Sequence, residues 1–204
     1  MQIWPEISFY DLESDGELGH DFHHYRTQFS MSGADWPMPM DRLWYSYNIR
    51  LVHFIVFSTE VYFIPDSDYM CIQFYWLLDD LTKANQNRDK QPWIVAMAHR
   101  PMYCSNNSTD DCTGWIIGNK VKHGLEDLFY TQGVDLILQA HEHSYERLWS
   151  VCKDEVVVND YNNPTVPIHI ISGAAGSSEG ANSLDEGKIW SAFRDKGFDS
   201  DCQR

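Results

Sequence analysis

Two histidines stand one residue apart in the segment VDLILQAHEHSYERL, residues 134–148, just after a run of apolar residues. Neutral imidazole is the commonest metal ligand in proteins. Side chains at positions i and i+2 of an extended segment point to the same side, so His141 and His143 can reach one metal ion or two adjacent ones. The same pair also fits loop histidines that hydrogen-bond to their neighbours, and the pattern alone leaves both interpretations open.

A third histidine favours the metal interpretation. His99 follows the apolar segment PWIVAMA, residues 92–98, just as His141 follows residues 134–139. Three histidines without carboxylates are typical of a single zinc site. His53 and His169 lie inside expected strands, and we interpret both as structural.

The elements that must position these histidines follow from hydrophobic periodicity. Strands are expected at 43–49, 52–59, 92–98, 134–139 and 167–172, and a second helix at 124–132 is expected to end at Gly133 in a left-handed cap. A first helix at 68–87 would bury its apolar positions and expose two aspartates: Met70, Phe74, Leu77, Leu78, Leu81, then Asp79 and Asp80. This order predicts an α/β fold, in which ligands bind beyond the carboxyl ends of the strands.

Length and charge limit the functional class. A chain of 204 residues suits one domain. Its net charge of -15 argues against a nucleic-acid partner, because phosphates would be repelled. No apolar run reaches the roughly 18 residues that span a bilayer. The N-terminal residues show no basic and apolar regions of a secretory signal.

The cysteines and sequons nevertheless point to the secretory pathway. Cys104 and Cys112 bracket a short polar loop, CSNNSTDDC, which a disulfide could close. The loop carries two overlapping glycosylation sequons, at Asn106 and Asn107. We expect Cys71, in the first helix, to be a buried free thiol.

Four segments together resemble the purple acid phosphatases, most of all the animal acid phosphatase type 7 group. They are LWYSYNIRLVHFIVFSTEVYF, PWIVAMAHRPMYCSNNSTDDC, GLEDLFYTQGVDLILQAHEHSYERLW and VPIHIISGAAG, and WSAFRDKGF (190–198) resembles a further family segment. The resemblance implies the C-terminal part of an αββα metallophosphatase sandwich. It also implies a secreted enzyme that hydrolyses small phosphate monoesters at a two-metal centre, through metal-bound hydroxide.

The resemblance implies roles for the histidines and names the metals. His99 matches the family's fourth ligand block, and His141 and His143 match the fifth, with Ala140 in place of a glycine. By the family's scheme His99 and His141 hold a divalent ion (Zn, Fe or Mn), and His143 holds ferric iron.

The N-terminal ligand blocks depart from the family pattern. SFYDLESDGELGHDF resembles the second block with Tyr10 as the tyrosinate ligand, but Ser8 or Ile7 replaces the bridging aspartate. An alternative alignment lays SDGE, residues 14–17, over the third block and makes Asp15 a ligand. We therefore expect residues 1–25 to be a remodelled segment and residues 26–204 a catalytic-domain fragment with at most partial metal occupancy and no assigned catalytic residue. The oligomeric state is left open.

Two other hypotheses remain. The chain could be a non-catalytic secreted glycoprotein or binding module that retains this part of the fold and one metal. It could also be an α/β domain whose histidines are structural. Metal content separates the enzyme from the binding module, since two metals per chain favour the enzyme.

Overall fold

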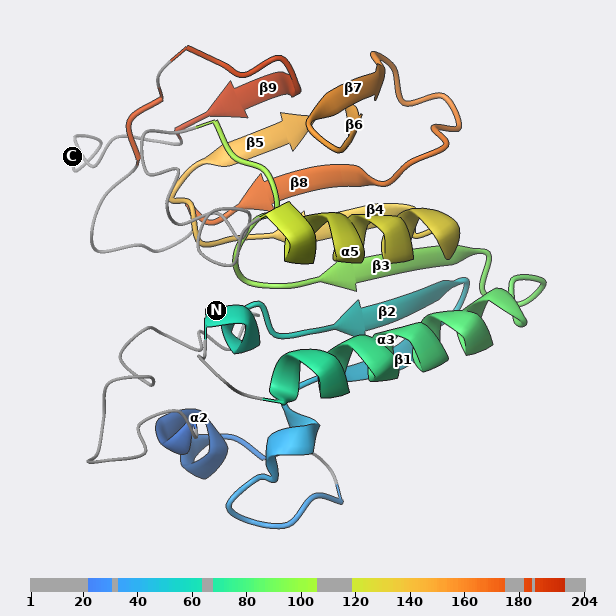
Figure 1. Ribbon diagram of the computed structural model, residues 1–204, viewed down its shortest axis with the longest axis vertical. Coiled ribbons are helices and arrows are strands. Elements are labelled where there is room, and N and C mark those ends of the chain that lie inside the picture. The colour runs from blue at the N-terminus through green and yellow to red at the C-terminus, as the bar shows by residue number, and fades with distance from the viewer. Residues whose placement is uncertain are drawn as a thin grey trace.

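The computed structural model describes residues 22–30, 33–63, 68–105, 119–174, 182–184 and 186–196. Within these ranges a seven-stranded mixed sheet runs in the order β1-β2-β3-β4-β8-β5-β9 (Figure 1). A separate antiparallel pair, β6-β7, lies beside it. The strands are β1 Tyr45–Ile49, β2 Val52–Val56, β3 Trp93–Met97, β4 Leu136–Gln139, β5 Tyr145–Leu148, β6 Ser150–Cys152, β7 Glu155–Val158, β8 Ile168–Ser172 and β9 Ser191–Asp195.

The centre of the sheet is parallel and its edges are antiparallel. Strands β2, β3, β4 and β8 pair in parallel, so their carboxyl ends meet along one edge. At one side β1 and β2 form a hairpin, and at the other β5 pairs antiparallel with both β8 and β9. All five predicted strands are present with slightly shorter bounds. Strands β5, β6, β7 and β9 were missed because they are short and mix polar with apolar residues.

Two helices cover one face of the sheet, as Figure 1 shows. They are α3, Tyr69–Asn85, and α5, Asn119–Thr131, and the smaller helices are α2 (His23–Gln28), η1 (Met40–Arg42) and η2 (Glu60–Phe63). The main core lies between these helices and the sheet, with Ile55, Ile94, Leu77 and Phe129 fully buried. A second cluster, around Val56, Val95 and Met97, belongs to the other face of the same strands. These features agree with the predicted α/β class.

Helix α3 packs on the core along most of its predicted apolar face: Leu77 and Leu81 are buried, and Met70 and Phe74 pack partly buried against the core. Its buried residues are Gln73, Leu77, Leu81 and Ala84. Gln73 is fully buried because its amide bonds to both the N–H and the carbonyl oxygen of Ser58, at 2.7 and 2.8 Å. The prediction of a buried Cys71 is therefore wrong: the thiol is free and exposed, because it lies two residues from Gln73, away from the core face.

Two further assignments on α3 are wrong. Leu78, expected inside, is 36% exposed. Asp80, expected outside, accepts hydrogen bonds from Ser46 at 2.7 Å and from His53 at 2.8 Å. This aspartate attaches the helix to the hairpin β1–β2, and only the packed structure reveals its partners.

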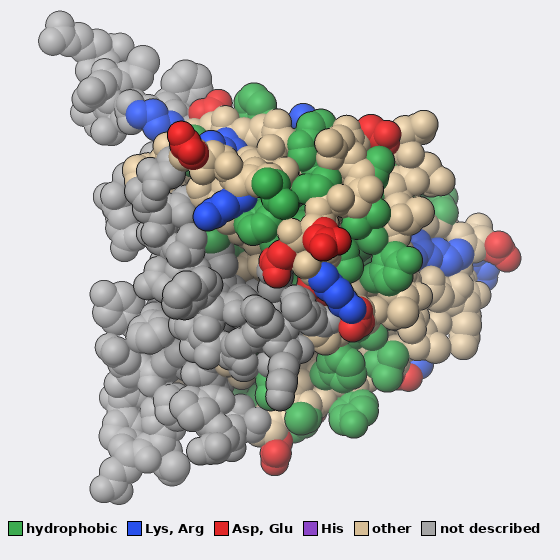
Figure 2. Space-filling model, turned by 45° about the horizontal axis from the view of Figure 1, so that its top comes forward, with side chains coloured by type: hydrophobic (Ala, Val, Ile, Leu, Met, Phe, Trp, Pro, Cys, Tyr) green, Lys and Arg blue, Asp and Glu red, His purple; other side chains and the backbone are tan. Residues whose placement is uncertain are grey.

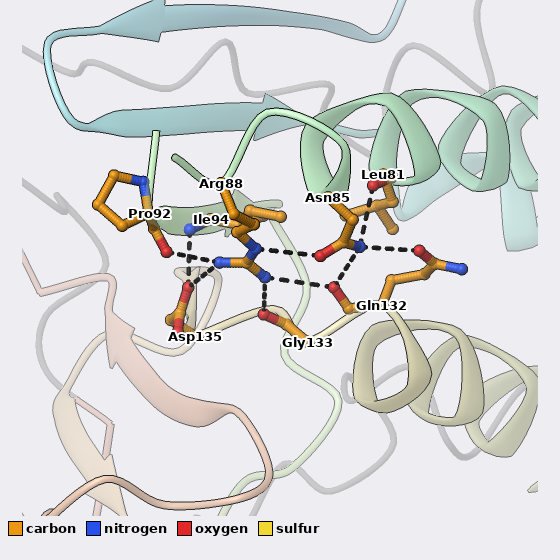
Figure 3. Close-up of polar contacts among 8 residues, drawn as sticks. All are labelled: Leu81, Asn85, Arg88, Pro92, Ile94, Gln132, Gly133 and Asp135. Carbon is orange, nitrogen blue, oxygen red and sulfur yellow. Dashed lines mark hydrogen bonds and ion pairs between the residues drawn. The ribbon is translucent and has the colours of Figure 1, made fainter. Parts of the chain in front are cut away.

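A polar cluster fixes the ends of α3, β3 and α5 opposite the carboxyl edge of the sheet (Figure 3). Arg88 pairs with Asp135 at 2.9 Å and donates to the carbonyl oxygens of Pro92 and Gly133. Asp135 also accepts from the Ile94 N–H at 2.7 Å. Gly133 has φ +62°, so α5 ends in the predicted left-handed cap, and the chain turns directly into β4.

The surface mixes apolar and charged side chains. Figure 2 shows green hydrophobic side chains across the described part of one face, with Lys, Arg, Asp and Glu side chains between them. Single exposed apolar residues of this kind are normal on soluble surfaces. Among the described residues, no helix has the length and apolar character needed to cross a bilayer.

Candidate metal centre

The histidines lie where parallel strands end. Strands β3 and β4 pair side by side, and the Ala140 N–H donates to the His99 carbonyl oxygen at 2.8 Å just beyond them. This bond joins the two loops that carry His99 and His141. The His141 Nδ1 and His99 Nε2 atoms are 2.9 Å apart, and the two rings meet nearly edge to face, at 79°.

The turn after β4 is tight and holds His141 in an uncommon backbone conformation. His141 has φ +63°, and the Glu142 N–H donates back to the Ala140 carbonyl oxygen at 2.7 Å. A positive φ at a residue other than glycine costs free energy and is found often at functional sites. Gly173, after β8, packs so closely on this turn that a Cβ there would lie 2.2 Å from the Glu142 carbonyl oxygen.

Asn182 holds the far side of the turn. Its Oδ1 accepts from the His143 N–H at 3.2 Å, and its N–H donates to the His143 carbonyl oxygen at 3.1 Å. Its Nδ2 donates to the buried Glu142 carboxylate at 2.8 Å. The three residues 141–143 are thus fixed by contacts on both sides.

Burial and neighbouring positive charge keep two of the imidazoles neutral. The pKa of His99 is lowered to about 3. Burial is the largest cause, and the positive charges of the neighbouring His141, Arg100 and His143 lower it further. The pKa of His141 is lowered to about 4, again mainly by burial and then by the positive charges of Arg100 and His143. His143 therefore lies close enough to lower the pKa of both His99 and His141. Neutral imidazoles offer nitrogen lone pairs to a metal even under mildly acidic conditions.

Sequence reasoning missed two charged residues in this region. Arg100 and Glu60 form a buried ion pair, with Arg100 Nε 2.9 Å from Glu60 Oε1. Arg100 Nη1 also lies 3.2 Å from His141 Nε2. A signal was present for both, since Arg100 directly follows His99 and Glu60 follows the end of β2. Nothing in the sequence marks Asn182.

Several predicted site residues fall outside the described ranges. Tyr10 and Asp15 lie in residues 1–21, and Asn106, Asn107 and Cys112 lie in residues 106–118. Cys104 is disulfide-bonded and buried. Because Cys112 is not described, its pairing with Cys104 stays a prediction, and so do both sequons.

The described residues fit part of a metal site. Two nitrogen ligands of a tetrahedral zinc ion would be about 3.3 Å apart, so His99 Nε2 and His141 Nδ1 need to separate only slightly. However, no group of three or more His, Cys, Asp or Glu residues suited to a metal ion occurs within the described part of the chain. Two donors do not make a binuclear centre.

The fold and the strand-end histidines resemble those of an α/β domain of the metallophosphatase type. The calcineurin-like phosphoesterase model matches residues 20–145, and the chain belongs to this family. The fold is shared with the purple acid phosphatase from yellow lupin (Lupinus luteus) seeds, at a TM-score of 0.63 and 24% identity over 76% of this chain and 27% of the lupin chain. Membership implies a two-metal site, and the predicted fold class is confirmed.

The curated relatives that the chain resembles are named acid phosphatases. The chain is 45% identical over 210 residues to acid phosphatase type 7 of Homo sapiens, covering 96% of this chain and 46% of that protein. It is 31% identical to purple acid phosphatase 18 of Arabidopsis thaliana, covering 84% and 37%. The predicted relationship to the purple acid phosphatases is thus confirmed. The chain spans less than half the length of these relatives.

Proposed function

We propose that this chain is the histidine-bearing part of an acid-phosphatase-type phosphoesterase, acting on small phosphate monoesters. The observation that carries the proposal is the approach of His99 Nε2 and His141 Nδ1 to 2.9 Å at the carboxyl ends of β3 and β4. Similarity to acid phosphatase type 7 over 96% of the chain supports the choice of reaction.

In this proposal His99 and His141 serve one divalent ion, either Zn, Fe or Mn, and His143 serves ferric iron. Tyr10 and Asp15 are the candidates for oxygen ligands, since hard ferric iron prefers oxygen. We expect the site to be at most partly occupied in this chain, because its N-terminal ligand blocks depart from the family pattern. The chain alone is therefore a poor catalyst.

The proposed location is the secretory pathway. The disulfide at Cys104 supports it, because disulfides persist in oxidising compartments. The sequons at Asn106 and Asn107 fit the same location.

A second candidate function is a non-catalytic, secreted binding module with the same fold. The departure of the N-terminal ligand blocks from the family pattern favours it. The two candidates differ in metal content, since the enzyme binds two metal ions per chain and the binding module one or none.

The proposal is tested by loading the purified chain with iron and zinc and assaying an aryl phosphate at acidic pH. We expect a colourless protein and turnover at least roughly a thousandfold below that of an intact relative, which is about 4 kcal/mol of lost transition-state stabilisation. His141→Asn should abolish the remaining turnover. His53→Gln, a matched histidine change on β2 outside this cluster, should retain it.

Three results would change the proposal. Residual turnover that survives His99→Asn and His141→Asn together would mean that the histidine pair is not the reactive centre. No turnover at all, with one metal ion or none bound, would favour the binding module instead. A purple band with near-normal turnover would mean that the N-terminal residues complete the site.

A further inference from the structure

A pocket of about 230 Å³ lies in the helix layer, where α3 and α5 come close to η2. Both long helices lie over the same face of the sheet (Figure 1). Seven residues from these three elements line the pocket: Tyr62, Met70, Cys71, Phe74, Tyr75, Gly124 and Leu125. None of them belongs to the histidine cluster, so the pocket is separate from the candidate metal centre.

The lining residues range from buried to exposed. Tyr62 and Leu125 are 5% and 2% exposed, and they form the inner wall. Met70 and Phe74 are partly buried and pack against the main core. Tyr75 is 68% exposed and marks the side that opens to solvent. The pocket therefore has a buried interior that a small molecule can enter from outside.

The chemistry of the lining favours an uncharged ligand. The side chains that line the pocket are aliphatic, aromatic or sulfur-containing, and none carries a formal charge. The hydroxyl group of Tyr62 already accepts a hydrogen bond from Gln73 Nε2 at 3.0 Å. A charged group that moved from water into such a lining would lose its hydration without gaining a partner. A charged ligand is therefore disfavoured.

The same lining favours a planar ring over an aliphatic chain. The thioether of Met70 and the thiol of Cys71 are polarizable, and sulfur makes favourable contacts with aromatic rings. Phe74 and Tyr75 meet edge to face, with ring centroids 6.0 Å apart and an interplanar angle of 81°. Aromatic rings prefer this geometry, and a third ring in the pocket can adopt it with either residue.

The volume limits the size of the ligand. An apolar cavity of about 150 Å³ stays dry and binds benzene. The pocket beside Tyr62 has about 230 Å³, which is enough for a substituted single ring or for two fused rings. Larger molecules would extend into solvent and lose the burial that supplies the affinity.

Gly124 leaves one wall of the pocket open. Glycine inside a helix is unfavourable, because its backbone loses more conformational freedom on folding than that of any other residue. A Cβ at this position would meet nothing within 4 Å, so packing against the rest of the described chain does not require glycine. The missing side chain instead adds space to the pocket, and a large side chain there would fill it.

We propose that this pocket binds an uncharged aromatic molecule of one or two rings, with the Cys71 thiol at its accessible edge. Burial of the ring against Tyr62, Phe74 and Leu125 supplies the affinity, and the open side lets the ring enter. The inference goes beyond the proposed function and does not depend on it, since no metal ion or histidine takes part.

The first experiment measures binding directly, with indole as the probe and saturation-transfer NMR as the readout. The purified full chain should show saturable binding with a Kd below about 1 mM, within the free energy per atom that small ligands reach. Gly124→Leu, which fills the pocket, should abolish saturable binding. Lys83→Leu is the matched control, because it adds the same side chain at an exposed position in the last turn of α3 and should retain binding.

The second experiment needs no variant and uses Cys71 as a reporter. Iodoacetamide alkylates accessible thiols, and peptide mass spectrometry separates Cys71 from Cys152, a thiol outside this pocket. Indole at saturation should slow the alkylation of Cys71 several-fold, because the bound ring covers the thiol. It should leave the rate at Cys152 unchanged.

Two results would overturn the inference. An absence of saturable indole binding to the wild type would mean that the pocket does not hold a ring. Indole binding that survives Gly124→Leu, with unchanged alkylation of Cys71, would place the ring elsewhere on the protein. If Gly124→Leu does not fold, as judged by circular dichroism, the alkylation rates alone decide: protection of Cys71 but not of Cys152 supports the site, and equal rates with and without indole refute it.

Discussion

At the scale of single residues, Gly173 shapes the turn that carries the histidines. A Cβ at this position would meet the Glu142 carbonyl oxygen at 2.2 Å and its carbonyl carbon at 3.0 Å. Both are backbone atoms, so the turn itself would have to move. The Gly173 N–H also donates to the Ser144 carbonyl oxygen at 3.2 Å, which keeps β8 against the turn.

We therefore expect Gly173→Ala to lower the free energy of unfolding by about 1–3 kcal/mol, the usual range for overpacking. Urea denaturation measures the change. Gly124→Ala is the matched control, because a Cβ there meets nothing within 4 Å and the residue lies in α5. Alanine in the helix should stabilise by about 0.5–1 kcal/mol. A Gly173→Ala protein as stable as the wild type would show that the close approach is not maintained in solution.

Buried tyrosines make the folded protein less stable at alkaline pH. Burial raises the pKa of Tyr25 to about 12, with a further contribution from Tyr45. Burial also raises the pKa of Tyr62 and of Tyr103, and Tyr103 is affected next by its bond to Glu126. These phenols are neutral in the folded protein at a pH where the unfolded chain loses protons.

Because the pKa values of these tyrosines are raised in the folded state, the stability of the fold decreases at high pH. Above pH ~10 the unfolded state releases protons that the folded state keeps, so stability falls as the pH rises from about 10 toward 12. Absorbance at alkaline pH should show that these tyrosines, of eleven in the chain, ionise only when the protein unfolds. Urea-unfolded protein, in which all should ionise near pH ~10, is the control. Complete ionisation near that pH in folded protein would disprove the prediction.

At the scale of elements, the Arg88 cluster holds three chain segments together (Figure 3). Arg88 lies just beyond α3 and donates to Asn85 Oδ1 at 3.0 Å and to the Gln132 carbonyl oxygen at 3.3 Å. Asn85 Nδ2 donates to the same Gln132 carbonyl oxygen at 2.7 Å. These bonds fix the ends of α3 and α5 relative to the start of β3.

Arg88→Leu should lower the free energy of unfolding by about 2 kcal/mol, since it removes partly buried hydrogen bonds to a charged group. Thermal unfolding or urea denaturation measures the loss. Lys83→Gln is the control: Lys83 pairs with Asp79 on the surface of the same helix, where both side chains are more than half exposed. Such pairs contribute little, so no measurable loss is expected. An equal effect of both changes would contradict the special role of Arg88.

At the scale of the whole molecule, the sheet brings distant segments to one edge. Parallel pairing of β2, β3 and β4 places residues 60, 100 and 141 beside one another, although about 40 residues separate each from the next. The helices on one face give the strands a fixed platform. The site is thus assembled from segments that follow neighbouring strands of one sheet.

The sequence alone determined the class of fold and the first candidate site. Runs such as WIVAM and LILQ identify buried strands, and a histidine after each run marks the same edge of a parallel sheet. These signals are local, since they depend on side-chain type and on spacing of a few residues. The family motifs around His99 and His141 added the reaction class and the expected metals.

Only the tertiary structure decided which polar atoms face each other. The partners of Arg100 and Asp80, the burial of Gln73 and the exposure of Cys71 all depend on contacts between separate elements. A sequence pattern records that a residue is polar or apolar, but not which group lies opposite it after packing. For the same reason, two strand-end histidines could be read from the sequence, whereas the guanidinium group of Arg100 that lies 3.2 Å from His141 Nε2 could not.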